Sequence, residues 1–313
     1  MKYMRFTSFI ILLLFFITAC SSETSNNNQQ SDKIEKEETV SLSVGLMPAV
    51  DAAPILLAEK EGYFDDLNLD LDAKIYTNAN NRQSAIQANE LDGTMTDLIA
   101  YINNKHNGFD TKIVTSTDGS FAFLVGDNFE QKGRKKLGIM EVSVSNYLAD
   151  HYVAKDYNIE KVYIPEIPTR LEMVQTEQLD IGFFPEPIAS NGEVAGLTKL
   201  ISITDDDGYM PEAMVFTTKA LNEKREAIQR FIKGYNQAVN AINSDDTLAR
   251  EVLIEAIDLK PEIQDLITLP TYHQARIPSE EYMNKIITWV EEVQKIQTNL
   301  KYDEMIAKEY TES

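Results

Sequence analysis

"VSLSVGLMPAVDAAPILLAEKEGYF" occupies residues 40–64, and this stretch decides the fold class. Residues 40–46 are rich in apolar and β-branched side chains and predict a strand. Residues 54–64 carry apolar side chains at helical spacing, and Gly62 is the expected C-terminal cap. Asp51 lies in the short connection between the two. A strand that leads directly into a helix predicts the first unit of an α/β fold, so we expect Asp51 either to cap that helix or to face a ligand.

The alternation of strand and helix continues along most of the chain. Further strands are predicted at 68–76, 93–95, 111–117, 120–126, 135–140, 161–165, 179–184, 198–203 and 212–218, and further helices at 80–90, 97–105, 144–157 and 169–178. Such alternation implies parallel sheets covered by helices. The chain is also longer than one hydrophobic core usually supports, so we expect two lobes.

The predicted architecture is α/β, with two lobes that each hold a mostly parallel sheet flanked by helices. Residues 40–125 and 213–313 are assigned to the first lobe, and residues 126–212 to the second. The chain passes between the blocks near 120–126 and again near 212–218, which are the expected hinge segments. The last third of the chain predicts a helical tail on the first lobe. Ligands of open α/β sheets bind beyond the carboxyl ends of the strands, so we expect a site in the cleft between the lobes.

The N-terminus has the features of an export signal. Lys2 and Arg5 precede an uncharged run of fourteen residues, which is shorter than the roughly 20 apolar residues of a membrane span. The run ends at Cys20, the only cysteine, in a pattern that resembles a bacterial lipoprotein signal. We therefore expect a signal peptide over 1–19, a lipid on Cys20 that anchors the protein to the extracytoplasmic face of the cell membrane, and a flexible tether over 20–39. The alternative is an ordinary secretory signal followed by a chance cysteine.

The chain is strongly acidic, with a formal net charge of −21 at pH 7. Removal of the two basic residues with the signal peptide would make the charge −23. Such a surface repels nucleic acid and anionic lipid headgroups, so we expect neither as a partner. One cysteine allows no internal disulfide, and we expect a monomer stabilised by its buried core.

Four stretches together resemble a known family of receptors. They are "AAPILLAEKEGYFDDLNLDL" (52–71), "AIQANELDGTMTD" (85–97), "KGRKKLGIMEVSVSNYL" (132–148) and "MVQTEQLDIGFFPEP" (173–187). In their order and spacing they are similar to the solute-binding proteins of ABC importers, of the sulfonate/nitrate/taurine and thiamine-pyrimidine-precursor binding family with a periplasmic-binding-protein type II-like fold. The resemblance covers about 40–235. It implies a receptor that closes two lobes on a small organic solute outside the membrane and delivers it to a membrane permease and its ATPase.

Eight residues are candidate ligand contacts, because they follow strands or open helices where the cleft is expected. They are Asp51, Thr96, Asp97, Asp118, Ser143, Ser145, Phe184 and Glu186. Ser143 and Asp97 also suit the N-cap position of a helix, and Asp118 suits a turn. Glu186 lies between two prolines and is harder to explain as a cap, which favours a ligand contact.

Four of these candidates are carboxylates, and no lysine or arginine falls in the same loops. A bound anion favours open helix N-termini or cationic side chains, whereas Asp51 and Asp97 would fill helix N-termini with protein carboxylate. The pattern therefore favours a neutral or cationic ligand that donates hydrogen bonds, such as a thiamine-precursor aminopyrimidine stacked on Phe184. A sulfonate, nitrate or taurine-type anion is the alternative, and Arg82 or Arg170 could supply its cation.

The sequence shows no spacing typical of a metal site or a catalytic centre. Asp51, Asp97, Asp118 and Glu186 could hold a hard cation together, but they match no metal motif, so a metal receptor is the weaker alternative. The three histidines lie far apart, and no nucleophile motif is present. We expect a binding protein rather than an enzyme, with no catalytic residue and no cofactor.

Overall fold

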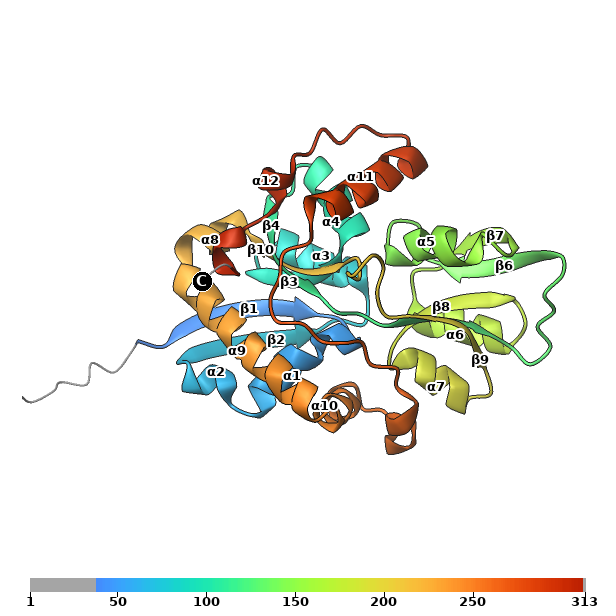
Figure 1. The fold of residues 1–313 in the computed structure, drawn as a ribbon, viewed down its shortest axis with the longest axis horizontal. Helices are drawn as coiled ribbons and strands as arrows, with labels where there is room; N and C mark the ends of the chain where they lie inside the picture. The colour runs from blue at the N-terminus through green and yellow to red at the C-terminus, as the bar shows by residue number, and fades with distance from the viewer. Residues whose placement is uncertain (1–37, 312–313) are drawn as a thin grey trace, which may run out of the picture. The chain divides into compact units, whose positions relative to one another are not determined.

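The computed structural model describes residues 38–311, which form two five-stranded sheets flanked by helices (Figure 1). The first sheet has the strand order β2-β1-β3-β10-β4, with β1 (Val40–Leu46), β2 (Leu69–Ile75), β3 (Gly93–Asp97), β4 (Thr111–Thr117) and β10 (Glu212–Thr217). The second sheet has the order β7-β6-β8-β5-β9, with β5 (Phe121–Val125), β6 (Arg134–Ile139), β7 (Asn158–Tyr163), β8 (Ile181–Pro185) and β9 (Thr198–Ile203). Each sheet with the helices on its faces is here called a lobe.

Helices cover the sheets, as the alternation in the sequence predicts. They are α1 (Ala53–Lys60), α2 (Tyr63–Asp66), α3 (Ala79–Gln87), α4 (Leu98–His106), α5 (Val144–Leu148), α6 (Ile167–Gln175), α7 (Ile188–Val194), α8 (Thr218–Glu223), α9 (Arg225–Ser244), α10 (Thr247–Ile257), α11 (Glu280–Gln294) and α12 (Tyr302–Met305). Within the described part of the chain, no helix is long and apolar enough to cross a membrane. The predicted signal peptide, Cys20 and the tether lie outside the described residues.

The opening stretch forms the expected strand and most of the expected helix. β1 pairs in parallel with β2, and its inward side chains Val44 and Leu46 are fully buried. The chain then makes a short 3₁₀ turn at Val50–Ala52 and enters α1. Gly62 has a φ of 74° and separates α1 from α2. This left-handed conformation suits glycine and ends α1, which agrees with the C-terminal cap predicted at Gly62, and residues 63–64 belong to a separate short helix.

Four of the five strands in each sheet run in the same direction, which confirms the prediction of mostly parallel sheets. The exceptions are β10 in the first sheet and β5 in the second, each antiparallel to both of its neighbours. Both strands follow a crossing of the chain from one sheet to the other. By its pairing β5 belongs to the second sheet, although residues 121–125 were assigned to the first lobe. The crossing segments are therefore 118–120 and 204–211, just ahead of the strands predicted as hinges, and the exact lobe boundaries stay a prediction.

The two lobes repeat one local arrangement. The Asp92 carboxylate accepts a hydrogen bond from the backbone of Ser43 at 2.8 Å, and the Asp180 carboxylate accepts one from the backbone of Lys136 at 2.7 Å. In each case an aspartate directly before a later strand, β3 or β8, joins that strand to its parallel neighbour, β1 or β6. β1 and β6 also carry corresponding glycines, Gly45 and Gly138, each beside a leucine and the stem of an arginine from a helix. The lobes are therefore built on the same strand–helix plan.

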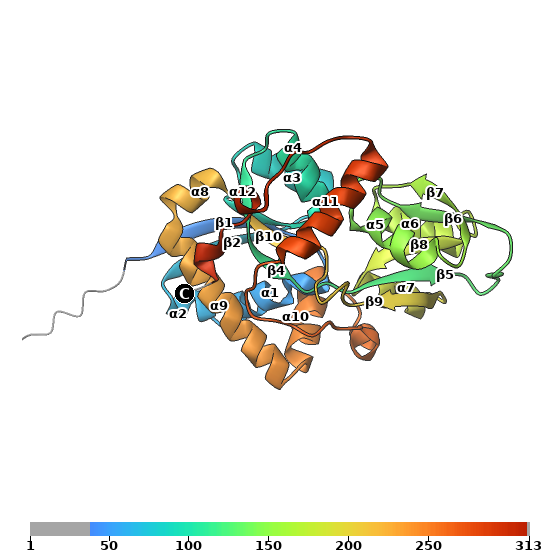
Figure 2. The same cartoon turned by 45° about the horizontal axis from the view of Figure 1, so that its top comes forward.

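The C-terminal part of the chain covers the first lobe but also contacts the second (Figures 1 and 2). Helix α9 packs with α1 and α10 over the first sheet. Residues 267–279 are extended rather than helical, so the tail is less helical than predicted. Helix α11 packs on α4, and its Trp289 donates a hydrogen bond to Asp150 of the second lobe at 3.2 Å. The tail therefore bridges the two lobes.

Replacement of Gly234 in α9 by Ala should destabilise the fold. A Cβ atom at this position would lie 2.5 Å from a ring carbon of Phe64, which is buried and stacked on Phe231. Overpacking of this kind costs about 1–3 kcal/mol, which outweighs the gain of about 1 kcal/mol in helix propensity. We expect urea denaturation to show a lower free energy of unfolding for Gly234→Ala. The exposed neighbour Lys233 provides the control variant Lys233→Ala, and a stabilised Gly234→Ala protein would contradict the packing argument.

Candidate functional site

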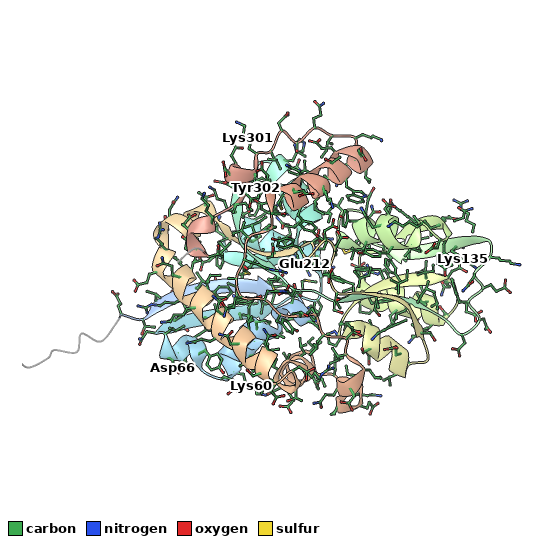
Figure 3. The ribbon with its side chains drawn as sticks, viewed as in Figure 1. Lys60, Asp66, Lys135, Glu212, Lys301 and Tyr302 are labelled. Carbon is green, nitrogen blue, oxygen red and sulfur yellow. The ribbon has the colours of Figure 1, made fainter. Side chains whose placement is uncertain are left out.

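A cavity of about 300 Å³ lies between the lobes, with walls from both. The first lobe contributes the loop after β1, the helices α3 and α4, and the start of β10, and the second contributes β5, β8, α5 and α6. The ionisable and aromatic residues that line the cavity are Asp51, Arg82, Asp97, Phe121, Arg170, Phe183 and Glu212. Glu212 lies near the centre of the molecule in Figure 3. A volume of this size is at the small end of the range for organic ligands.

Three carboxyl groups meet on the first-lobe wall because of strand register. Glu212 lies directly opposite Asp97 of β3 on one side and Thr117 of β4 on the other. The hydroxyl of Thr117 in turn donates a hydrogen bond to the Asp51 carboxylate at 3.1 Å. Like charges placed opposite each other on a sheet are destabilising. An arrangement that costs stability in this way is typical of a functional site.

The environment of these carboxyl groups disfavours their charged forms. Burial is the main cause, and it raises the pKa of Asp51 to about 7 and that of Asp97 to about 6. Burial and the nearby charges of Asp51 and Asp97 raise the pKa of Glu212 well above its usual value. Arg82 opposes these shifts, since its positive charge favours the ionised carboxylates.

Asp97 has a second role at the helix ends. Its side chain caps α4 by accepting a hydrogen bond from the backbone N–H of Ala100 at 2.8 Å. The nearby backbone of Val144, at the start of α5 in the second lobe, acts against burial and lowers the pKa of this carboxyl. The predicted cap and the predicted cleft position are therefore both realised in one residue. Its carboxylate occupies the positive end of α4.

Two buried arginines line the cavity from corresponding places in the two lobes. Arg82 is the fourth residue of α3 and Arg170 the fourth residue of α6, with 5% and 2% of their surfaces exposed. The stem of Arg82 passes Gly45 of β1, and that of Arg170 passes Gly138 of β6. For residues 38–311, neither guanidinium has a carboxylate within ion-pair distance, and the Nε atom of each is buried without a hydrogen-bond partner. Burial lowers the pKa of both, that of Arg170 to about 10.

These arginines weaken the charge argument made from the sequence. The strand-to-helix loops lack basic residues, but the cavity walls contain two, Arg82 and Arg170. Arg82 and Arg170 were named only as possible sources of positive charge for an anion. Both lie on helices, and only the packing of these helices in the tertiary structure places their side chains at the cavity.

Phe183 lines the cavity, and Phe184, the predicted stacking residue, does not. Successive side chains of a strand point to opposite faces of the sheet. Phe183 therefore turns toward the cavity and stacks on Phe121 with ring centroids 5.0 Å apart. Phe184 is fully buried in the core on the other face, where its ring lies 5.9 Å from the Arg170 guanidinium carbon.

Ser143 and Ser145 line the cavity as predicted, next to the start of α5. Ser143 is the N-cap of this helix, and its hydroxyl accepts a hydrogen bond from the backbone of Ser145 at 3.1 Å. The Ser145 hydroxyl accepts a hydrogen bond from the backbone N–H of Met140 at 2.9 Å. Both side chains are thus held in place by local contacts. Whether either contacts a ligand stays a prediction.

Glu186 lies away from the cavity, in a buried ion pair. Only 1% of its side chain is exposed, and its carboxylate lies 2.6 Å from the ammonium group of Lys199. It also accepts hydrogen bonds from the hydroxyl and backbone of Ser190 and from the backbone of Thr268. All of its acceptor positions are used by the protein. These contacts explain the buried carboxylate between two prolines without a ligand.

Asp118 and Thr96 also lie outside the cavity lining. Asp118, in the first crossing segment, accepts hydrogen bonds from the backbone and ring of His273 at 2.7 and 3.0 Å and from Arg276 at 2.8 Å. It thereby joins the crossing to the extended tail segment. Thr96 is buried, and its hydroxyl contacts the backbone carbonyl of Asp97 at 3.4 Å. Of the eight candidates, the structure brings together Asp51, Asp97, Ser143 and Ser145.

Glu212 is the cavity residue that the sequence argument missed. Polar residues were sought after the carboxyl ends of strands, where a parallel strand delivers them to the cleft. β10 runs in the opposite direction, so its first residue lies at that edge instead. An acidic residue directly before a wholly apolar run, as in "EAMVFT", was the available signal. In the described residues, no cluster of three or more histidine, cysteine or acidic side chains has a geometry suited to a metal ion.

Comparisons with known proteins agree on the fold. No family model matches the sequence. A Brachyspira hyodysenteriae protein named "Putative ABC transporter periplasmic binding protein" is 21% identical over 243 residues, and the match covers 69% of this chain and 69% of that protein. The zinc-bound ligand-binding component of an ABC-type import system from Staphylococcus aureus superposes with a TM-score of 0.70 at 14% identity, over 87% of this chain and 98% of its own.

Sulfonate-binding proteins and one enzyme share the same architecture. The periplasmic aliphatic sulphonate binding protein SsuA of Escherichia coli has a TM-score of 0.69 at 14% identity, over 85% of this chain and 97% of its own. The desulfurization enzyme DSZB has a TM-score of 0.65 at 10% identity, over 86% of this chain and 97% of its own. The similar structures are mostly transport binding proteins. The chain therefore has the periplasmic binding protein fold that the sequence resemblance implied.

Proposed function

We propose that this chain is the extracytoplasmic solute-binding component of an ABC importer, which captures a small organic solute between its lobes and delivers it to a membrane permease. The observation that carries the proposal is the cavity itself. It is enclosed by both lobes and lined by buried ionisable side chains from each. Burial of such groups costs free energy unless a partner or a ligand offsets it. The shared fold of ABC-type binding proteins supports the proposal. Lipid attachment at Cys20 would keep the receptor at the membrane surface.

The solute is proposed to carry an amine or other N–H donor. Asp51, Asp97 and Glu212 offer carboxyl groups to such a donor, and ring stacking with Phe121 or Phe183 suits a heterocycle. A thiamine-precursor aminopyrimidine has both features. The alternative is a sulfonate-type anion, which Arg82 and Arg170 would favour, as in the E. coli protein of similar fold that is named for sulphonate binding.

The direction of the pH dependence separates a basic ligand from an anion. Asp51, Asp97 and Glu212 face the cavity with raised pKa values, and Arg82 and Arg170 stay charged across the neutral range. Between pH 5 and 8 the pKa values of about 7 and 6 mean that Asp51 and Asp97 lose their protons. Attraction for a cation therefore grows over this range, and attraction for an anion falls.

The experiment is titration calorimetry of the full protein with an aminomethyl aminopyrimidine and with butanesulfonate, at pH 5 and pH 8. We expect the amine to bind about tenfold or more tightly at pH 8, since one unit of pKa change corresponds to a factor of ten in the equilibrium constant. If butanesulfonate binds more tightly at pH 5 and the amine does not bind, the solute is a sulfonate-type anion. If the protein binds neither the amine nor the sulfonate, and no related small solute, the receptor proposal is wrong.

A further inference from the structure

The charges in the cavity are divided between the lobes. The first-lobe wall carries Asp51, Asp97 and Glu212 with Arg82 among them, so its carboxyl groups outnumber its cations. On the second-lobe wall, Arg170 is the single ionisable side chain among the described lining residues. The two walls therefore differ in kind, because one is rich in carboxyl groups and the other carries a guanidinium.

Glu212 has no protein partner for its side chain. The residue is 8% exposed, yet within residues 38–311 no group donates a hydrogen bond to its carboxyl oxygens. Asp51 and Asp97 differ, because Thr117 and Ala100 donate to them. The Glu212 carboxyl lines the cavity, so the cavity is the side from which a donor can come.

Arg170 is the matching group on the opposite wall. One terminal nitrogen donates to the backbone carbonyl of Ile164 at 2.7 Å, but the Nε atom is buried without a partner. No ion pair to Arg170 is formed by any residue in the described part of the chain. The ring of Phe184 supports the guanidinium from the core side. A guanidinium that is 2% exposed and unpaired is likewise costly unless an acidic group reaches it through the cavity.

From these two unpaired groups we infer that the natural solute is dipolar, with a basic group that binds at Glu212 and an acidic oxygen group that binds at Arg170. This inference rests on the proposed receptor function and narrows its substrate class. It makes Glu212 and Arg170 the residues that determine specificity, one in each lobe. Asp51 and Asp97 add further carboxyl groups to the wall of Glu212, and the positive charge of Arg82 favours their ionised forms.

A dipolar solute also explains why closure would depend on the correct ligand. A ligand shifts a conformational equilibrium only by its differential affinity for the two states. A solute with one charge gains its main contact from one wall alone and stabilises an open form nearly as well. A solute with both charges completes its contacts only when the walls come together, so its binding energy favours the closed form.

The test compares three probes that share one aromatic frame. They are para-aminomethylbenzoate, which is dipolar, para-methylbenzylamine, which lacks the acid, and para-toluate, which lacks the amine. Binding to the full protein is measured by calorimetry and by thermal shift, for the unaltered chain, Glu212→Gln and Arg170→Met. Glu172→Gln and Arg134→Met, at exposed positions of the second lobe, are the matched controls.

We expect the dipolar probe to bind more tightly than either relative by on the order of a hundredfold, as for the loss of one partner from a buried charge pair. Both site variants should reduce this preference to less than about tenfold and stay folded, and the controls should retain it. If a single-charge probe binds as tightly as the dipolar one, or if Arg170→Met leaves dipolar binding unchanged, the dipolar inference is wrong while the receptor function stands. If none of the three probes binds although the aminopyrimidine or butanesulfonate does, the dipolar inference is also wrong, and if no ligand of either experiment binds, the receptor function itself is wrong.

Discussion

Replacement of Asp51 by Asn should make the protein more stable at neutral and alkaline pH while it weakens binding of a basic solute. The carboxyl is buried, and its pKa is raised from 3.8 to about 7. The folded protein therefore holds a proton on Asp51 more tightly than the unfolded chain does. This linkage lowers stability as pH rises from about 4 to 7, and the full penalty is present above pH 7.

Asn carries no charge at any of these pH values and can still accept the hydrogen bond from Thr117. We expect the free energy of unfolding to rise by on the order of 2–4 kcal/mol at pH 8, since each unit of pKa shift corresponds to about 1.4 kcal/mol. The gain should shrink as pH falls and vanish below about pH 3, where the carboxyl is protonated in the folded and the unfolded state. Chemical denaturation at several pH values measures it, with the exposed Asp65→Asn as control. A gain that does not depend on pH would show that charge burial is not its cause.

Replacement of Lys199 by Met should cause the largest loss of stability. Lys199 lies 2.6 Å from Glu186 and 2.8 Å from Glu193, and its removal leaves the Glu186 carboxylate buried without a counter-ion. Breaking one side of a buried pair costs about 3–5 kcal/mol. Lys199 also donates to the carbonyl of Leu266, so the joint between β9 and the tail would loosen as well.

The double variant Lys199→Met with Glu186→Gln should recover much of this loss, because no buried charge is then left unpaired. Lys301 is 79% exposed and provides the control variant Lys301→Met, for which we expect a change within about 0.5 kcal/mol. Guanidinium denaturation measures all three proteins. If the single and double variants lose equal stability, the ion pair is not the reason, and the packing of the lysine stem is.

Much of the fold was predictable because the relevant signals are local. The strand and helix patterns around β1 and α1 depend on side chains a few positions apart, so they can be read directly from the sequence. The extended tail segment was harder to predict. His273 and Arg276 lie there because they contact Asp118, which is far away in the sequence. No local pattern reports such a contact.

The candidate site was predictable only where the strand-to-helix rule applied. Asp51 and Asp97 follow parallel strands and line the cavity as that rule requires. Glu186 also follows a parallel strand, but Lys199 and Ser190 close around it. The rule predicts which residues lie at the edge of the sheet. It does not predict whether other side chains of the protein bind the same carboxylate.

The sequence by itself determined an α/β chain with two similar blocks, an acidic surface and a cleft edge rich in short polar side chains. These properties follow from composition and from periodicities of two and 3.6 residues, which neighbouring positions establish. Only the tertiary structure decided that Glu212 faces Asp97, that Phe183 rather than Phe184 turns to the cavity, and that Arg170 lies opposite the carboxyl cluster. Those outcomes depend on strand direction, register and the packing of distant segments. The physical reason is that the charge of a site depends on all residues that lie close together in the folded protein, and these residues are far apart in the sequence.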